Sequence, residues 1–504
     1  SQGLMELPPP SPAAQGLKEL SPPSPPALGL IELATHLSPA WGINAPPSRG
    51  GRGGRTSLPT LLLALSLAGC QLTGPLPVAE PTGSFAAGQL LVQFKPQTTD
   101  DAVESINRAV GATTLDRLGT EGLWLVSVPP GHEREVMDRY RGQGQVAYSE
   151  VNRSVSTQMV GGFRPYVARQ IQADPPKDPL YYPEPLGPDN TPRRGLPGQW
   201  GLDAMKVRDA WNTTLGTAAI KVAVLDTGVD MGHDDLKANL DTANAYNFVD
   251  AKTPTNPDDD YGHGTHVAGI IAATANNGLG IAGVAPGCKV MPIRVLGVEG
   301  GSTANLIRGI DWAVSHGARV LNMSLGSNQY SRAEEDAIKR AIAQGVVVVA
   351  AAGNEALSGN PLSYPGAIEG VVSVAALRRD VDATGTATGT YSRADYSNFN
   401  PFVTVAAPGS DILSTIPRRF QSPGGVASDA PYAYASGTSM ASPMVAGVVA
   451  LMLSKNDKLT PQQVLAKLRS SADVSTLRDS LGNAVTARPN LIFGSGLVQA
   501  AGAL

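Results

Sequence analysis

The sequence has few cysteines, no long apolar run and almost no net charge, and each of these absences excludes a class of protein. Two cysteines, Cys70 and Cys288, allow at most one disulfide, which excludes a disulfide-stabilised scaffold. No run of about 18 apolar residues is present, so we expect no membrane-spanning helix. With 39 basic and 43 acidic side chains the net charge is −4, so the sequence does not indicate a nucleic-acid-binding protein.

The rest of the composition is that of a large globular protein. Of the 504 residues, 42% are hydrophobic, which is enough for a sizeable core, and 16% are charged, which is too few for a disordered polyelectrolyte. The 56 glycines and 41 prolines lack the every-third-residue period of collagen. From length alone, about three or four domains are expected.

The first 87 residues are predicted to lie outside the folded domains. Residues 1–57 are rich in Pro, Ser and Gly, and we interpret them as a disordered extension or as sequence translated from upstream of the true start. Residues 58–70 follow an arginine-containing flank and join an apolar run to small residues before Cys70, which indicates an export signal. A buried apolar segment with an ordinary cysteine is the alternative. Residues 71–87 are interpreted as a linker.

Residues 88–157 are predicted to form a small α+β domain. Strands are expected at 89–94, 123–128 and 145–148, and helices with one apolar face at 100–110 and 133–141. This order is typical of a ferredoxin-like fold. Residues 158–199 lose periodicity and collect Pro and Gly, so we interpret them as a linker and N-terminal arm.

Residues 200–504 are predicted to form one doubly wound α/β domain with a mainly parallel sheet. Six Val/Ala-rich runs are apolar on both faces, as buried parallel strands require. They lie at 220–225, 290–295, 318–323, 346–352, 371–376 and 403–407. Helical periodicity at 265–276, 303–316 and 331–344 alternates with these runs. Ser331 with Glu334 indicates a capping box, and Thr460 with Pro461 and Gln463 marks another helix start.

Four polar residues stand where strands end or helices begin. Asp226 follows a buried strand, His263 opens a helix and Ser439 opens a long apolar helix. Because the active crevice of an open α/β sheet lies at the carboxyl ends of its strands, these three can converge there. Acyl transfer needs a hydroxyl nucleophile, a base and a carboxylate that holds the base's tautomer. Asn354, after the most apolar strand, could donate to an oxyanion together with the backbone N–H of Ser439.

The motifs around these residues resemble those of the subtilisin-like serine protease (subtilase) family. They are Asp226-Thr227-Gly228, His263-Gly264-Thr265-His266, Ala352-Gly353-Asn354 and Gly437-Thr438-Ser439-Met440-Ala441-Ser442-Pro443, in the order of the family. The resemblance covers about residues 200–504. It implies that Asp226 orients His263, that His263 is the base, that Ser439 attacks and that Asn354 stabilises the oxyanion.

The resemblance also implies substrate-binding residues. Gly300-Gly301-Ser302 and Ser324-Leu325-Gly326 would each pair with the backbone of an extended substrate, which would explain tolerance of many substrate sequences. Ala352 and Gly353 would form the walls of the S1 pocket, with Ser363 near its base and Glu355 at its rim. Small walls favour large apolar side chains, and Glu355 could favour a basic one. These residues are Gly300, Gly301, Ser302, Ser324, Leu325, Gly326, Ala352, Gly353, Glu355 and Ser363.

A structural Ca²⁺ site is implied in the same way. Oxygen atoms from Asp, Asn and loop carbonyls are the ligands that Ca²⁺ prefers. The residues that align with the family's site are Asp178, Asp235, Ala275, Asn277, Leu279 and Ile281. The alternative is an ordinary Asn-Gly-rich turn with a solvated Asp235.

The family resemblance implies that residues 88–157 are a prodomain, which we expect to assist folding, to inhibit the protease and to be removed by self-cleavage. The stretch Ser149-Glu150-Val151-Asn152 resembles the part of such prodomains that lies across the active site, and the cut is expected between residues 150 and 178. A permanent binding domain is the alternative. Leu67-Ala68-Gly69-Cys70 resembles a lipobox, so we expect the protein to be exported and either secreted or lipid-anchored at Cys70 on the bacterial envelope. We also expect a monomer that acts on proteins and peptides.

Several other interpretations are disfavoured by the residues themselves. An α/β-hydrolase esterase has the order Ser, Asp, His, whereas this chain has Asp, His, Ser. A catalytically dead subtilase acting as a scaffold would lack a triad member, and none is lacking.

The Gly278–Gly283 segment matches a dinucleotide fingerprint but lacks the strand before it. His263 and His266 lack a third metal ligand, and His266 is expected to be structural. Asp258-Asp259-Asp260 is interpreted as a solvated loop.

Overall fold

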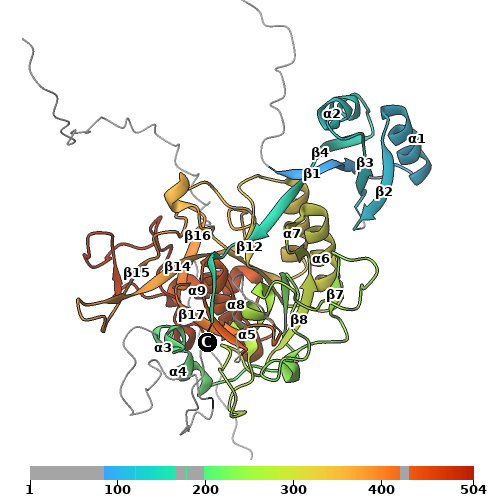
Figure 1. Ribbon diagram of the computed structural model, residues 1–504. Coiled ribbons are helices and arrows are strands. Elements are labelled where there is room, and N and C mark those ends of the chain that lie inside the picture. Colours follow the sequence, from blue (N-terminus) through green and yellow to red (C-terminus); the bar gives the residue numbers. More distant parts are fainter. Residues whose placement is uncertain (1–83, 120, 166–177, 179–197, 420–430) are drawn as a thin grey trace, which may run out of the picture. The chain divides into compact units, whose positions relative to one another are not determined.

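The computed structural model describes residues 84–119, 121–165, 178, 198–419 and 431–504 (Figure 1). The predicted extension, the export signal with Cys70 and most of both linkers lie outside these residues. Cys288 is a free thiol and fully buried, as a small hydrophobic residue would be.

The N-terminal part has the predicted ferredoxin-like order of strands and helices. Its elements are β1 (Phe85–Phe94), α1 (Asp100–Val110), β2 (Thr113–Leu118), β3 (Leu123–Ser127), α2 (Glu133–Arg141) and β4 (Val146–Thr157). The antiparallel sheet has the order β2-β3-β1-β4. Side chains from the sheet and both helices share one buried cluster that includes Phe94, Val103 and Tyr140. The sequence did not indicate β2, because four of its six side chains are exposed and it lacks apolar alternation.

The larger part is built on a parallel sheet in the order β7-β8-β6-β11-β13-β14-β16. These strands are β7 (Tyr246–Asn247), β8 (Lys289–Arg294), β6 (Lys221–Asp226), β11 (Val320–Met323), β13 (Val347–Ala351), β14 (Val372–Val381) and β16 (Val403–Pro408). At the far edge, β15 (Ala387–Arg393) pairs antiparallel with β14 and carries β19 (Leu477–Arg478). All six predicted strands are present, and the strand order reverses direction at β6.

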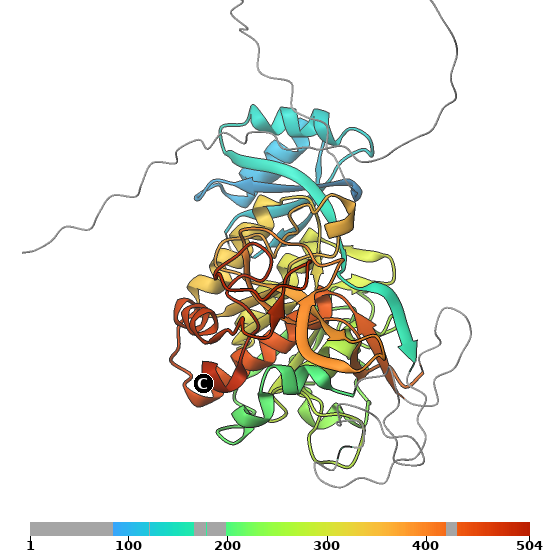
Figure 2. The same ribbon diagram turned by 90° about the vertical axis from the view of Figure 1, so that its left-hand side faces the viewer.

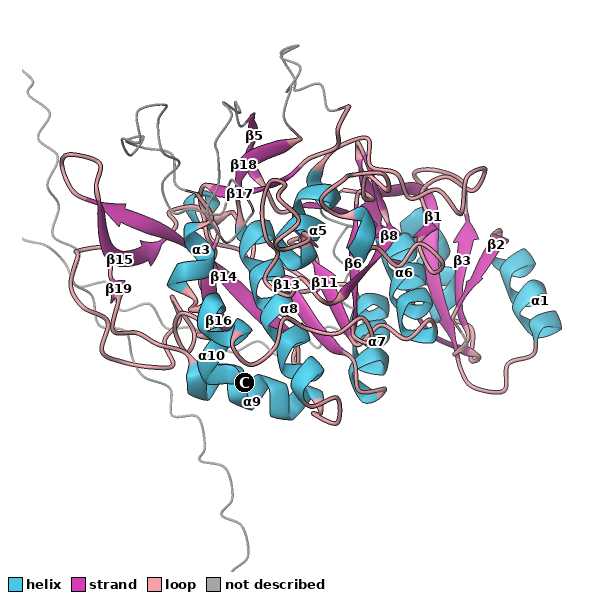
Figure 3. Ribbon diagram, turned by 90° about the horizontal axis from the view of Figure 1, so that it is seen from below, coloured by secondary structure: helices cyan, strands magenta, loops and turns pink. Residues whose placement is uncertain are grey.

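The sheet is buried on both faces by helices (Figure 3). Along β6, Val222 and Val224 belong to one buried cluster, whereas Ala223 and Leu225 belong to the other. The first cluster contains side chains of α5 (His263–Ala272), α8 (Thr438–Lys455), α9 (Pro461–Ser471) and α10 (Ala500–Ala503). The second contains side chains of α6 (Thr303–Ser315) and α7 (Arg332–Ala343). Two short helices, α3 (Trp200–Ala204) and α4 (Val207–Trp211), precede the sheet.

Helix α8 is long and apolar enough to cross a membrane by length and composition alone. However, 89% of its 18 residues are buried inside the domain, where its apolar side chains belong to the larger core cluster. It is therefore the core helix of this domain, and its first turn carries Ser439.

Short strands complete the molecule near the ends of the central strands. They are β5 (Val160–Pro165), β9 (Leu296–Gly297), β10 (Gly300–Ser302), β12 (Leu325–Gly326), β17 (Ile412–Thr415) and β18 (Tyr432–Ser436). Two 3₁₀ turns, Lys237–Asn239 and Ala356–Ser358, lie in loops. β5 lies within residues 158–199, the predicted linker and N-terminal arm, and is paired antiparallel with β18.

Candidate active site

Asp226 and His263 are in direct contact. Asp226 ends β6 and His263 begins α5, so both stand at the carboxyl edge of the sheet where the strand order reverses. Nδ1 of His263 lies 2.7 Å from Oδ1 of Asp226, and both side chains are fully buried. Nε2 of His263 is buried and has no hydrogen-bond partner within the described residues. The imidazole is therefore fixed on one side and has a nitrogen available on the other.

Asp259 is buried against the start of α5, a placement that the sequence did not indicate. Its carboxylate is buried and accepts hydrogen bonds from the Thr227 hydroxyl at 2.9 Å and the Gly262 N–H at 2.8 Å. It also accepts from the N–H and hydroxyl of Thr265, at 2.9 and 2.7 Å. It thus joins the residue after Asp226 to both sides of His263. The solvated-loop interpretation is wrong for Asp259, although its neighbour Asp260 is 55% exposed and pairs with Arg294.

Ser439 lies in the first turn of α8, fully buried beside a segment of the N-terminal domain. Its backbone N–H donates to the carbonyl oxygen of Gln158 at 3.0 Å. Its hydroxyl donates to the carbonyl oxygen of Ser324 at 2.9 Å rather than to His263. Ser439 therefore lies next to the peptide carbonyl of Gln158, and the rotamer of its side chain directs the hydroxyl to Ser324.

Asn354 is oriented by Thr438, a residue that the sequence did not single out. Its Oδ1 accepts from both the N–H and the hydroxyl of Thr438, each at 2.9 Å. This fixes the amide so that Nδ2 is the remaining donor, and Nδ2 is buried without a partner in the described part of the chain. A buried donor without an acceptor is costly, so an oxygen atom that arrived beside it would be stabilised.

The two predicted substrate-binding segments are paired with β4 of the chain itself. In β10, Gly301 pairs with Val155 and Ser302 with Ser154, and in β12, Leu325 pairs with Thr157 and Gly326 with Ser156, all antiparallel. Figure 2 shows β4 as one strand that continues from the N-terminal sheet into the larger domain. Beyond it, β5 pairs with β18. The cleft is therefore occupied by an extended segment on both sides of Ser439.

The stretch predicted to cross the active site was placed too early in the sequence. Residues 149–151 pair with β1 inside the N-terminal domain. Glu150 instead caps α7: its carboxylate accepts from the Ser331 hydroxyl at 2.6 Å and from the N–H groups of Arg332 and Ala333 at 3.1 and 3.2 Å. β4 is twelve residues long, and only its last residues enter the cleft.

The capping box predicted for α7 is formed only in half. The Ser331 hydroxyl accepts from the N–H of Glu334 at 3.1 Å, but the Glu334 carboxyl does not return to the helix start. Oε1 of Glu334 is buried without a partner among the described residues, and burial together with the charge of Glu150 raises its pKa to about 8. The box predicted at Thr460 and Gln463 is complete.

Two of the predicted substrate-binding residues, Gly326 and Ser363, lie beside the side chain of Gln158. An added Cβ on Gly326 would lie 3.2 Å from Nε2 of Gln158 and 2.6 Å from Oγ of Ser363. Ser363 is buried, and its hydroxyl has no partner within the described residues. Ala352 and Gly353 are buried, and Glu355 accepts from the N–H of Asn354 and from Asn398, both at 2.9 Å. These predicted pocket residues thus combine small side chains with a hydroxyl that is unpaired in the described part of the chain.

The loop predicted to hold Ca²⁺ brings its two aspartates together with main-chain groups. Asp178 accepts from the N–H groups of Asn276 and Asn277 at 2.6 and 3.1 Å. Asp235 accepts from the side-chain amide of Asn277 at 2.7 Å and from the N–H of Ile281 at 3.0 Å. Both carboxylates are fully buried, and burial raises the pKa of Asp235 to about 7. Ala275 and Leu279 lie in the same loop.

His266 is a structural residue, as expected. It is fully buried, and its Nε2 lies 3.1 Å from the carbonyl oxygen of Ala433. Burial lowers its pKa to about 3, so the ring is neutral. No group of three or more His, Cys, Asp or Glu side chains that could hold a metal occurs among the described residues.

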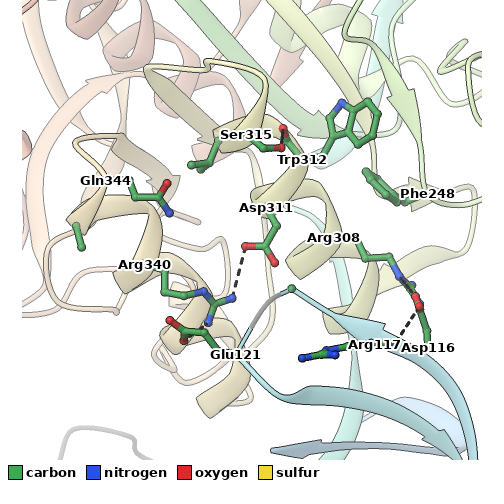
Figure 4. Close-up of a pocket in the computed structure, with 13 residues that line it drawn as sticks. Asp116, Arg117, Glu121, Phe248, Arg308, Asp311, Trp312, Ser315, Arg340 and Gln344 are labelled. Atoms are coloured by element: carbon green, nitrogen blue, oxygen red, sulfur yellow. Dashed lines mark hydrogen bonds and ion pairs between the residues drawn. The ribbon is translucent and has the colours of Figure 1, made fainter. Parts of the chain in front are cut away.

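Charged pairs join the N-terminal domain to α6 and α7 around a cavity of 760 Å³ (Figure 4). Arg308 of α6 pairs with Asp116 of β2 at 2.7 Å, and Arg340 of α7 lies 3.5 Å from both Glu121 and Asp311. The contact between the domains is thus partly ionic and surrounds open space.

Comparison with known proteins identifies the class to which this molecule belongs. Residues 217–496 match the model of the subtilase family, and residues 76–152 match the model of the fervidolysin N-terminal prodomain. The chain belongs to the subtilase family. It is a serine endopeptidase that carries an N-terminal prodomain as an intramolecular inhibitor, which confirms the resemblance, fold and enzyme class predicted from the motifs and rules out the esterase alternative.

Three relatives illustrate the similarity. The chain is 34% identical over 384 residues to a thermophilic serine proteinase of Bacillus sp. (strain AK1), covering 75% of this chain and 80% of the relative. It is 36% identical over 302 residues to subtilisin BL of Lederbergia lenta, covering 60% and 96%. The crystal structure of fervidolysin from Fervidobacterium pennivorans, a keratinolytic enzyme related to subtilisin, superposes with a TM-score of 0.65 at 30% identity, covering 84% of this chain but only 61% of fervidolysin.

Proposed function

We propose that this chain is an exported, self-processing zymogen that hydrolyses peptide bonds through Asp226, His263 and Ser439. The observation that carries the proposal is the buried pair of Asp226 and His263. The outer nitrogen of His263 lacks a partner among the described residues, and Ser439 stands at a peptide carbonyl. An imidazole held by a carboxylate takes the proton of a serine hydroxyl and later returns it to the leaving amine. Rotation about the Cα–Cβ bond of Ser439 would release its hydroxyl from Ser324 for this transfer.

The oxyanion would be held by two donors from different elements. The N–H of Ser439 already contacts a carbonyl oxygen, and Nδ2 of Asn354, unpaired among the described residues, is the second donor. Donors that are fixed before charge develops need no reorganisation during the reaction, which is why such sites contribute strongly to the rate. The start of α8 adds the positive end of its helix dipole.

A structural Ca²⁺ ion fits the loop around Asp235. Two fully buried carboxylates receive hydrogen bonds from N–H groups, an amide and a phenol, with no basic side chain bonded to either in the described structure. A divalent cation bound by Asp178, Asp235, Asn277 and loop carbonyls would neutralise them. The Ca²⁺ would supply loop stability, whereas the reacting groups would be those of the chain.

Export to the bacterial envelope or beyond is supported by the sequence around Cys70 and by relatives such as the minor extracellular protease Epr of Bacillus subtilis, to which the chain is 35% identical. Mass spectrometry of the mature protein's N-terminus in its native host tests this part. A lipidated or removed Cys70 supports export, and a mature protein that retains residues 58–70 contradicts it.

The experiment that tests the mechanism is labelling with diisopropyl fluorophosphate. The wild-type, processed enzyme should be labelled at Ser439, and Ser439→Ala should remain an unlabelled, uncut precursor. Ser470→Ala, on the exposed side of α9, is the matched control and should be labelled and processed normally. A folded wild-type protein that is neither labelled nor processed would support the scaffold alternative instead.

A further inference from the structure

We infer that the bond this protease cuts first is Gln158–Met159 of its own chain. This processing site deepens the proposed function and rests on it. The sequence alone limited the cut to residues 150–178 and placed the prodomain boundary after residue 157. The position of the chain in the cleft selects one bond within that range.

The carbonyl of Gln158 is the one that the catalytic groups face. Its oxygen accepts from the N–H of Ser439 at 3.0 Å. The same oxygen lies 2.4 Å from where a Cβ on Gly437 would be, and Cα of Met159 lies 3.0 Å from that point. The Gln158–Met159 peptide is therefore packed directly on the start of α8, where only glycine leaves room for it.

Main-chain pairing fixes the register on both sides of this bond. The N–H of Gln158 donates to the carbonyl oxygen of Ser324 at 3.2 Å, and Ser156 pairs with Gly326 of β12. After the bond, Val160 pairs with Ser436 of β18. A shift of one residue would turn every side chain of the segment to the opposite face, so the pairing specifies one carbonyl rather than a region.

Side-chain burial supports the same register. The Gln158 side chain is 5% exposed and lies beside Gly326 and the free hydroxyl of Ser363. Three residues earlier, Val155 is 2% exposed and belongs to the apolar cluster that contains Leu296 and Ile307. The cleft thus holds an uncharged polar side chain before the bond and an apolar one further upstream, which describes the sequence this site accepts.

The cleavage itself follows the usual balance of acyl transfer. Oγ of Ser439 bonds to the carbonyl carbon of Gln158 while its proton passes to Nε2 of His263. The C–N bond to Met159 then breaks, and the new amine takes that proton. Water hydrolyses the Gln158 ester, which releases the prodomain with a C-terminal carboxylate at Gln158 and restores the Ser439 hydroxyl.

The primary test is the mass of the released prodomain. The full chain is expressed, self-cleavage is stopped at short times with an organophosphate, and the C-terminus of the prodomain fragment is read by intact-mass and peptide mass spectrometry. We expect it at Gln158. This end is informative even if the new N-terminus of the mature enzyme is trimmed later.

The second test changes the residue before the bond. Gln158→Glu keeps the side-chain shape but puts a charge where the Gln158 side chain is only 5% exposed, so the first-order rate of self-cleavage should fall at least about tenfold. Gln145→Glu, at an exposed position of the prodomain, is the matched control and should process at the wild-type rate.

The outcomes separate this inference from the proposed function. An active, Ser439-labelled enzyme whose prodomain ends at another residue overturns the inference and leaves the function standing. Equal processing rates for Gln158→Glu and wild type also overturn it. A folded precursor that is neither cut nor labelled overturns the proposed function and the inference with it.

Discussion

Replacing Asp259 should affect stability and self-cleavage far more than replacing its neighbour Asp260, although the local sequence does not distinguish the two. Asp259 accepts five hydrogen bonds around the start of α5, two of them on Oδ2 from the N–H and hydroxyl of Thr265. Asp260 forms an exposed ion pair with Arg294. The informative variants are therefore Asp259→Asn and Asp260→Asn, made in the uncut Ser439→Ala precursor and in the active chain.

The size of the effect follows from what an amide cannot do. In either orientation, the NH₂ group of an asparagine at position 259 faces at least one backbone N–H that has lost its acceptor. A hydrogen bond to a charged acceptor contributes about 1.5–3 kcal/mol, and an unsatisfied buried donor costs about 1–3 kcal/mol. We expect a loss of about 2–4 kcal/mol for Asp259→Asn and less than about 1 kcal/mol for Asp260→Asn, as for other exposed ion pairs.

Two assays measure this difference. Urea unfolding of the Ser439→Ala precursors gives the free energy of unfolding without self-digestion. In the active chains, a displaced His263 should slow self-cleavage by about 10- to 100-fold in Asp259→Asn alone. If the two variants unfold within about 0.5 kcal/mol of each other and process at the same rate, Asp259 does not position the catalytic histidine and the reasoning is refuted.

Three further predictions concern the oxyanion, pH and calcium. Asn354→Ala should lower kcat by about 10²–10³-fold with little change in KM, the size established for an oxyanion donor in subtilisin itself; an unchanged kcat would contradict the role of Nδ2. Glu334 has a pKa of about 8 in the folded precursor against 4.5 ordinarily, so between these values the unfolded chain is ionised and the folded one is protonated. The unfolding free energy of the Ser439→Ala precursor should therefore fall as pH rises through this window and level off above it, and Glu334→Gln should remove this part of the slope; an unaltered slope would refute it. A Ca²⁺ chelator should lower the melting temperature of the wild-type enzyme but not that of Asp235→Asn. Relative to Ca²⁺ at 100 times its Kd, its removal corresponds to a loss of about 2.7 kcal/mol in the free energy of unfolding. Equal chelator effects on both proteins would count against the site.

The strands of the large sheet could be predicted because burial on both faces leaves a continuous apolar run, as at Val347–Ala351. The motifs of the proposed catalytic residues could also be located, because each stands at the end of such a run or at a helix start. β2 could not be predicted, since its side chains are largely exposed and its pairing is decided by the neighbouring β3. Local sequence likewise could not distinguish Asp259 from Asp260, because the difference is made by Thr227, 32 residues away.

The contacts of Glu150 illustrate a second limit of sequence reasoning. A Ser-x-x-Glu pattern at Ser331 and Glu334 predicts a capping box, yet a carboxylate from 181 residues earlier occupies the helix start. A sequence pattern within one helix predicts only the capping hydrogen bonds that this helix can form by itself. A carboxylate from a neighbouring element can bind the same N-terminal groups instead, as Glu150 does here. The same applies to the cut: only the docked strand shows which carbonyl meets Ser439.

The twelve residues of β4 belong to two sheets at once, since the strand pairs with β1 at one end and with β10 and β12 at the other. One strand therefore connects the fold of the N-terminal domain to the occupied cleft. A substitution that loosens the core beneath Tyr140 would shorten the lifetime of the complex without touching the protease, and a tighter inhibitor would delay the appearance of activity. If the proposed processing is correct, substitutions in the N-terminal domain alone would change how long the enzyme stays latent.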